Sequence, residues 1–95
     1  ETARNPVSLT PGHGQVIFIR EGRNQAAPGD MLIVDRGTRD GLQAGEVLLV
    51  ARPSRVGGGA AYLGQALVVR ADAGTATCRV LTAVEELRLG DLLTR

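Results

Sequence analysis

The sequence predicts an all-β domain, a small barrel of about six short strands with no long helix. Short apolar runs rich in Val, Ile and Leu recur about every 8–12 residues, and Gly, Pro and Asp separate them, which is typical of small barrels and sandwiches. No segment repeats apolar residues at helical spacing over the length that a stable helix needs. The chain has 13 Gly but one Phe, one Tyr and no Trp, so we expect many tight turns and an aliphatic core.

The 95 residues divide into a lead-in and one domain. Residues 1–14 are polar and contain two prolines, which predicts an extended lead-in or linker. Residues 15–95 are expected to form a single small β-barrel domain, in which Gly64 marks a bulge or bend. Residues 84–90 fit either a single helical turn or an extended return. The expected strands are, in chain order, 15–20, 30–35, 46–52, 62–71, 75–83 and 91–94.

A pattern of Gly, acid and apolar run recurs three times, as PGDMLIV, AGEVLLV and LGDLLTR. The glycines Gly29, Gly45 and Gly90 are expected to start strands, because a tight turn often needs a positive φ. The acid that follows each glycine can accept hydrogen bonds from the amides of the turn. Three active sites in so short a chain are implausible, so the repeated pattern indicates a rule of the fold.

The acidic loop RGTRDGLQAGE, residues 36–46, is interpreted in the same way, as a turn and not as a site. We expect Gly37 and Gly41 to occupy turn positions, and Asp40 to cap the turn GLQAG that follows it. Leu42 is expected to plug the end of the barrel.

The residues that could act as catalytic nucleophiles or bases lack partners. His13 is the only histidine and lies in the lead-in, while Ser8 and Ser54 lie in loops with no base beside them. A triad of Ser54, His13 and Asp40 can be written down, but no local motif such as G-x-S-x-G supports it. We therefore expect no catalytic residues and no enzymatic activity.

Cofactor and metal sites are not expected either. Cys78 is the only cysteine, which excludes an intrachain disulfide, and a structural zinc site needs more ligands than Cys78 and His13 provide. The run ATCRVL around Cys78 predicts a small buried core residue. The adjacent Glu85 and Glu86 would point to opposite faces of a strand, which is unfavourable for a carboxylate pair. The Gly-rich segments GHG and VGGGAAYLG lack the lysine and the strand–loop–helix context of a P-loop.

Charge and hydropathy exclude two classes of partner. The net charge is +1, and the eleven basic residues, all Arg, are spread along the chain with no interleaved aromatic residues. Binding to nucleic acid is therefore not expected. No apolar run approaches the roughly 18 residues of a membrane helix, so no membrane span is expected.

The strands carry apolar residues on both faces, as in the runs MLIV, VLLV and ALVV. A free-standing small barrel should be polar outside. Two explanations stay open: loops cover the outer face, or the domain packs against another domain or subunit. Strand alternation does not give the register, so the outward residues are expected to be some of Leu32, Val34, Leu48, Val50, Leu67 and Val69.

The segment VDRGTRDGLQAGEVLLVAR, followed by LGQALVVRADAGTATCRVLTAVEELRLGDLL, resembles the C-terminal β domain of bacterial envelope proteins with an N-terminal LysM peptidoglycan-binding module. The resemblance spans about Asp30 to Leu93. Similar turns occur in β domains of the rod-shape scaffold MreC family and of flagellar assembly proteins. No LysM module lies in these residues, so the resemblance implies an envelope setting without implying peptidoglycan binding. The matching residues are Gly37, Asp40, Gly41, Leu42, Gly45, Val47, Leu48, Gly64, Val68, Gly90 and Asp91.

These observations predict a non-catalytic accessory or interaction domain of a bacterial cell-envelope protein, located in the periplasm or cell envelope. Its work would be protein–protein contact or spacing. The expected partner is another protein or a neighbouring domain of the same chain, and a homo-oligomer is possible. Two alternatives stay open: a glycan- or peptidoglycan-binding module, and an appended domain of a hydrolase. Only Phe18 and Tyr62 are available as aromatic platforms for sugars.

Overall fold

The computed structural model describes residues 6–7, 14–53 and 60–94. The described chain is all-β, with no helix of 7 or more residues, as the sequence predicts. Two short 3-10 turns, η1 (Arg20–Gly22) and η2 (Thr38–Asp40), interrupt the strands. The strands are β1 (Pro6–Val7), β2 (Gly14–Ile19), β3 (Gln25–Ala26), β4 (Met31–Val34), β5 (Val47–Pro53), β6 (Ala60–Ala71), β7 (Ala76–Ala83), β8 (Leu87–Arg88) and β9 (Leu92–Thr94).

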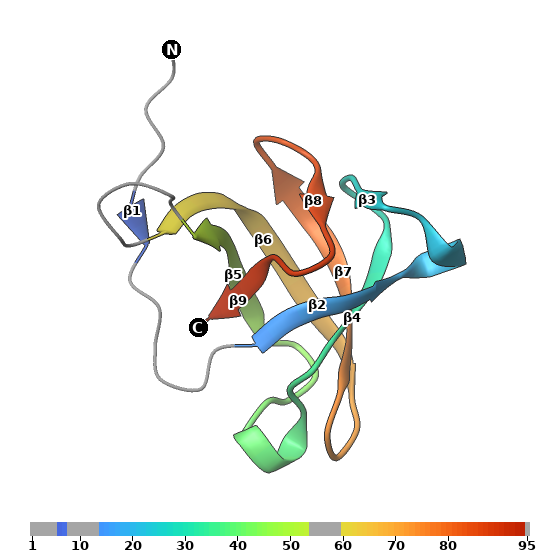
Figure 1. Cartoon of the computed structure of the whole chain (residues 1–95). Helices are drawn as coiled ribbons and strands as arrows, with labels where there is room; N and C mark the ends of the chain where they lie inside the picture. The colour runs from blue at the N-terminus through green and yellow to red at the C-terminus, as the bar shows by residue number, and fades with distance from the viewer. Residues whose placement is uncertain (1–5, 8–13, 54–59, 95) are drawn as a thin grey trace.

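Six of these strands form a closed antiparallel barrel, in the order β6-β5-β9-β2-β4-β7, and the pairing of β7 with β6 closes it (Figure 1). They correspond to the six strands expected from the sequence. The two-residue strand β1 lies within the expected lead-in and pairs with the start of β6. The strands β3 and β8 form a separate pair, so the segment 84–90 is an extended return and not a helical turn.

The three Gly–acid patterns form one turn, used three times. Each glycine has a positive φ, +93° at Gly29, +96° at Gly45 and +88° at Gly90. In each turn the carboxylate of the following acid accepts the N–H three residues before it, over 2.9, 2.8 and 2.7 Å. Each acid's own N–H also donates to the carbonyl of that same preceding residue. The expected role of the pattern is therefore confirmed.

All three turns dock on the barrel in the same way. Each glycine donates its N–H to the carbonyl of a valine on the neighbouring strand, and the same valine donates its N–H to the carbonyl of the acid. These valines are Val80 on β7, Val68 on β6 and Val16 on β2, and all are buried. The barrel thus consists of three strand pairs, β4 with β7, β5 with β6 and β9 with β2, each aligned by one copy of the turn.

The loop between β4 and β5 is a turn, with one correction to the expected geometry. Gly41 has a φ of +84° and Leu42 is buried in the core, as expected. Asp40, however, accepts the N–H of Gly37 over 3.0 Å and does not cap the turn that follows it. The acid that caps the later turn is Glu46, whose carboxylate accepts the N–H of Gln43.

Gly37 is needed for a close approach of two loops and not for a positive φ. Its φ is −150°, which any residue can adopt. A Cβ at this position would collide with the carbonyl oxygen of Asp72, in the turn between β6 and β7. Gly64 is similarly constrained, because a Cβ there would collide with the carbonyl oxygen of Thr82. Register shifts on both sides of Gly64 confirm the expected bulge in this strand.

The core fills the barrel with aliphatic side chains, and Leu32, Val34, Leu48 and Val50 all point inward. The other two of the six candidates for outward-facing residues lie on β6, where Val69 is exposed and Leu67 is half-buried. The outward residues of β4 and β5 are instead the alternate ones, Met31, Ile33, Val47 and Leu49.

Cys78 lies in this core with no exposed surface, as expected. Burial raises the pKa of its thiol to about 11, because the charged thiolate loses its hydration. We expect Ellman's reagent to leave Cys78 unmodified in the native protein at pH 8 and to modify it after denaturation. Rapid native labelling would contradict the burial of Cys78.

The same pKa shift predicts a dependence of stability on pH. Between the ordinary pKa of the thiol, near 9, and about 11, the unfolded chain loses the proton and the folded chain keeps it. Alkaline pH in this window therefore favours the unfolded state, and the free energy of unfolding should fall. A Cys78→Ala variant should show a smaller decrease over the same window, measured by urea denaturation.

Candidate interaction surface

Of the residues considered for catalysis, Asp40 and Cys78 lie in the part of the chain that the structure describes. Ser8, His13 and Ser54 lie outside the described residues. Asp40 is committed to the backbone of its own loop, and Cys78 is buried. Within residues 6–7, 14–53 and 60–94, no group of three or more His, Cys, Asp or Glu side chains is placed to hold a metal ion. The described part of the chain also has no helix long and apolar enough to cross a membrane.

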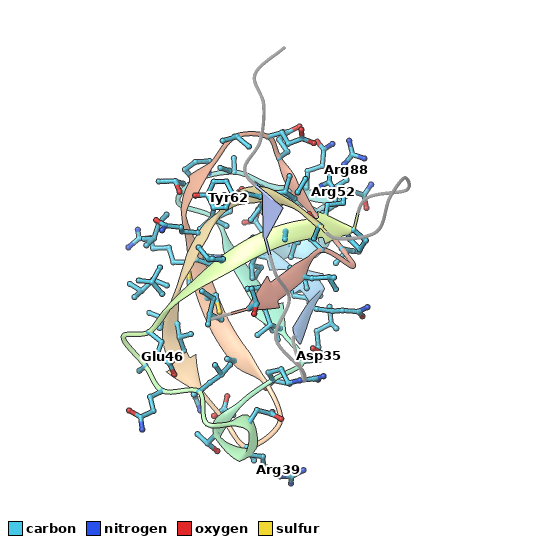
Figure 2. The ribbon with its side chains drawn as sticks, turned by 90° about the vertical axis from the view of Figure 1, so that its left-hand side faces the viewer. Asp35, Arg39, Glu46, Arg52, Tyr62 and Arg88 are labelled. Carbon is cyan, nitrogen blue, oxygen red and sulfur yellow. The ribbon has the colours of Figure 1, made fainter. Side chains whose placement is uncertain are left out.

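A charged cluster that the sequence did not reveal lies at one end of the barrel, around Arg52. The Nε and Nη2 atoms of Arg52 each donate to one carboxylate oxygen of Asp91, both over 2.9 Å. Its Nη1 atom donates to Glu85 over 2.8 Å. The pKa of Arg52 is raised by the hydrogen bond with Asp91 and by the negative charge of Asp91, while burial opposes this. Figure 2 shows Arg52 near Arg88 at one end and Arg39 at the other.

This cluster is structural. Asp91 is almost fully buried, and the oxygen that binds Arg52 Nη2 also accepts the N–H of Arg88, which closes the third copy of the turn. Arg52 thereby fastens the turn before β9 to the end of β5. Both oxygens of Asp91 are engaged, so neither is free to bind a substrate.

An apolar surface on the outside of β2 and β4 is a better candidate for a binding site than the cluster around Arg52. A register shift between Val16 and Phe18 interrupts the pairing of β2 with β4. A bulge of this kind allows two successive side chains to face the same side, and Ile17 and Phe18 are 47% and 46% exposed. Phe18 lies opposite Ile33 on β4, and Ile33 lies opposite Thr77 on β7. These side chains form one continuous row across three strands.

This row borders a groove of about 300 Å³ on the outer surface. We call it the apolar groove, because carbon atoms make up almost all of its lining. Met31 and Ile33 face it from alternate positions of β4, and Phe18 borders it from β2. The complete lining consists of Phe18, Arg20, Met31, Leu32, Ile33 and Thr77.

The apolar surface continues beyond the groove onto the next strands. Met31 lies opposite Arg79 on β7, and Arg79 lies opposite Leu67 on β6. Leu67 in turn lies opposite Val47 on β5, which is 47% exposed. Val69, beside a register shift in β6, adds another exposed aliphatic side chain. The sequence left two explanations open for the two-faced strands, and one was that loops cover the outer face. Loops within the described residues do not cover this surface, because Phe18, Val47 and Val69 are all exposed.

One arginine lines the apolar groove, and a second lies next to it on β7. Arg20 begins η1 and lines the groove, and Arg79 lies across the strand pair from Met31. Neither side chain has an ion-pair or hydrogen-bond partner among the residues that the structure describes. The nearby acids are engaged elsewhere, because Glu21 pairs with Arg23 over 3.0 Å and Asp30 accepts a backbone N–H of its own turn. The groove therefore combines an apolar floor with positively charged edges.

The chain matches no protein-family model, and neither a curated protein nor a solved structure matches it.

The sequence predicted an outward apolar face but neither the groove nor its arginines. The signal for the face was the unbroken apolar run MLIV, which leaves Met31 and Ile33 outside whenever Leu32 and Val34 point inward. The exposure of Phe18 depends on a bulge, and the bulge has no signature in the sequence around it.

Proposed function

We propose that this chain is a non-catalytic interaction domain of a bacterial cell-envelope protein, which contacts another protein through the outside of β2, β4 and β7. The observation that carries the proposal is the groove on the outer surface, which is lined by the exposed Phe18 and the half-buried Met31 and Ile33. Contiguous exposed apolar surface of this kind is typical of interaction sites, and aromatic and methionine side chains are enriched in them.

The envelope setting rests on the resemblance to the β domains of LysM-containing envelope proteins. That resemblance includes Gly45, Gly90 and Asp91, which the structure places in the repeated turn. These turn residues are consistent with the fold of such a domain. The cell-envelope setting and the location in the periplasm or cell envelope are therefore proposed on the resemblance alone.

The alternative of a glycan-binding module has less support. Sugar sites commonly stack aromatic rings on the sugar and surround them with hydrogen-bonding side chains. Phe18 is the only aromatic residue that lines the groove, and Thr77 and Arg20 are its only polar side chains. A role as an appended domain of a hydrolase would keep the same contact surface.

An affinity isolation from the envelope fraction of the native organism tests the proposal. The baits are the wild-type domain, a Phe18→Ser/Ile33→Ser variant, and a control variant, Val84→Ser/Leu89→Ser. Val84 and Leu89 are exposed residues of the loops beside β8, so the control removes a similar amount of exposed apolar surface elsewhere. We expect at least one protein to be retained by the wild type and the control but lost from the groove variant, by quantitative mass spectrometry. Equal retention by all three baits would contradict the proposed surface.

A further inference from the structure

The size of the apolar groove limits what it can hold. Its volume of about 300 Å³ is at the lower end of the range of ligand pockets, roughly 300–1,000 Å³. Phe18, Met31 and Ile33 surround it, and Met31 is a flexible side chain that adapts to the shape of an apolar partner. A groove of this kind fits one or two aliphatic side chains from an exposed segment of a partner.

The charge at the groove restricts the partner further. Arg20 in η1 and Arg79 on β7 lie beside the apolar floor, and no acid among the described residues pairs with either side chain. Arg70, on the next strand and opposite Thr77, adds a third positive charge, although it pairs with Asp72 over 3.2 Å. Carboxylates on a bound segment would pair with the first two guanidinium groups, since arginine binds carboxylates through paired donors.

A second copy of this chain fits the groove poorly. A symmetric contact between two copies uses the same surface on both partners. Such a contact would bring two copies of Arg20 and two of Arg79 into one interface, where the nearest acids, Glu21 and Asp30, already bind Arg23 and a backbone N–H of the turn. Like charges across an interface disfavour association.

We infer that the apolar groove binds an acidic, apolar segment of another protein, with one or two aliphatic side chains between Phe18, Met31 and Ile33 and carboxylates on Arg20 and Arg79. This inference rests on the proposed function and adds the chemistry of the partner. The arginines select for acidic segments, and the groove selects for an aliphatic side chain beside the acid.

The inference is tested with three synthetic decapeptides in a Gly–Ser background. One carries two Leu and three Glu, the second has Lys in place of Glu, and the third has Ser in place of Leu. Met31 is the only methionine, so its methyl resonance reports on the groove in NMR titrations without ambiguity. We expect the Glu–Leu peptide to shift this resonance and to bind about ten-fold more tightly than either of the others. An Arg20→Glu/Arg79→Glu variant should reverse the preference, so that the Lys–Leu peptide binds more tightly.

Four outcomes would overturn the inference. Equal affinities for all three peptides, or binding that leaves the Met31 methyl unchanged, would remove the groove as the site. A Met31 shift that depends on protein concentration in the absence of peptide would show a second copy as the occupant. A Met31 shift caused by vesicles of anionic phospholipid, with none caused by the Glu–Leu peptide, would show a membrane surface instead. If the affinity isolation still finds a partner that depends on Phe18 and Ile33, the proposed function stands and only the acidic chemistry is wrong.

Discussion

Replacing Gly37 by alanine is expected to destabilise the barrel by about 3 kcal/mol, the upper part of the usual range for overpacked sites. The added Cβ would collide with the carbonyl oxygen of Asp72 and would also lie 2.8 Å from the backbone nitrogen of Thr75. Both neighbours are backbone atoms of the turn between β6 and β7, so no flexible side chain can move aside. That turn also accepts the N–H groups of Thr38 and Arg39 through its carbonyls, and the alanine would disturb both hydrogen bonds.

Gly74 provides a matched control in the same turn. A Cβ at Gly74 would meet no atom within 4 Å, and its φ is not in the left-handed region. Gly74→Ala should therefore change the free energy of unfolding by less than about 0.5 kcal/mol. Urea denaturation followed by circular dichroism measures both variants. Equal stability of Gly37→Ala and Gly74→Ala would show that the two loops do not meet as described.

The second large effect is expected at Asp91. Asp91→Ala removes the buried partner of Arg52 and the carboxylate that closes the turn before β9. Loss of one partner of a buried ion pair costs about 3–5 kcal/mol, and we expect about 3 kcal/mol because Arg52 is itself partly exposed. Thermal and urea denaturation measure the change.

Asp30 is the natural control for Asp91, because it has the equivalent place in another copy of the turn. Its side chain is 30% exposed, and its contact with Arg23 is long, at 3.6 Å. Asp30→Ala loses mainly one hydrogen bond to the N–H of Ala27, so it should cost about 1 kcal/mol. If the two variants were equally stable, the ion pair with Arg52 would contribute nothing beyond the turn itself.

The barrel strands could be predicted from the sequence because each is an apolar run that begins near a glycine, and three of them, β4, β5 and β9, directly follow a glycine and an acid. The local pattern fixes that turn three times, with the acid always accepting the N–H three residues before it. Asp40 also accepts the N–H three residues before it, that of Gly37, so the expectation that it would cap the following turn was wrong. The spacing of the three Gly–acid turns, applied to Asp40, would have predicted Gly37 as its partner.

Features that depend on contacts between distant parts of the chain could not be predicted. Arg52 and Asp91 are 39 residues apart, and nothing near Arg52 indicates a buried acid as its partner. The pair of β3 and β8 involves two residues on each strand, which is too short to show a periodic pattern. The register of the two-faced strands was equally undetermined, because a shift by one residue exchanges one apolar face for another.

The location of the groove depends on one such feature, the bulge in β2. Without the register shift after Val16, Ile17 and Phe18 would alternate between the inside and the outside of the barrel. The bulge exposes both, and it places the only phenylalanine of the chain beside Ile33.

The central claim, that the outside of β2 and β4 is covered by a partner in the cell, can be tested directly by photo-crosslinking. Phe18 is replaced by the photoreactive p-benzoylphenylalanine, which preserves the aromatic ring, in the protein expressed in its native organism. Arg39 in η2, exposed at the far end of the barrel from Arg52, takes the same residue as a control (Figure 2). Irradiation should produce a discrete adduct with one identifiable protein from position 18 and none from position 39. No adduct from position 18, or the same adducts from both positions, would contradict the assignment of this face as an interaction surface.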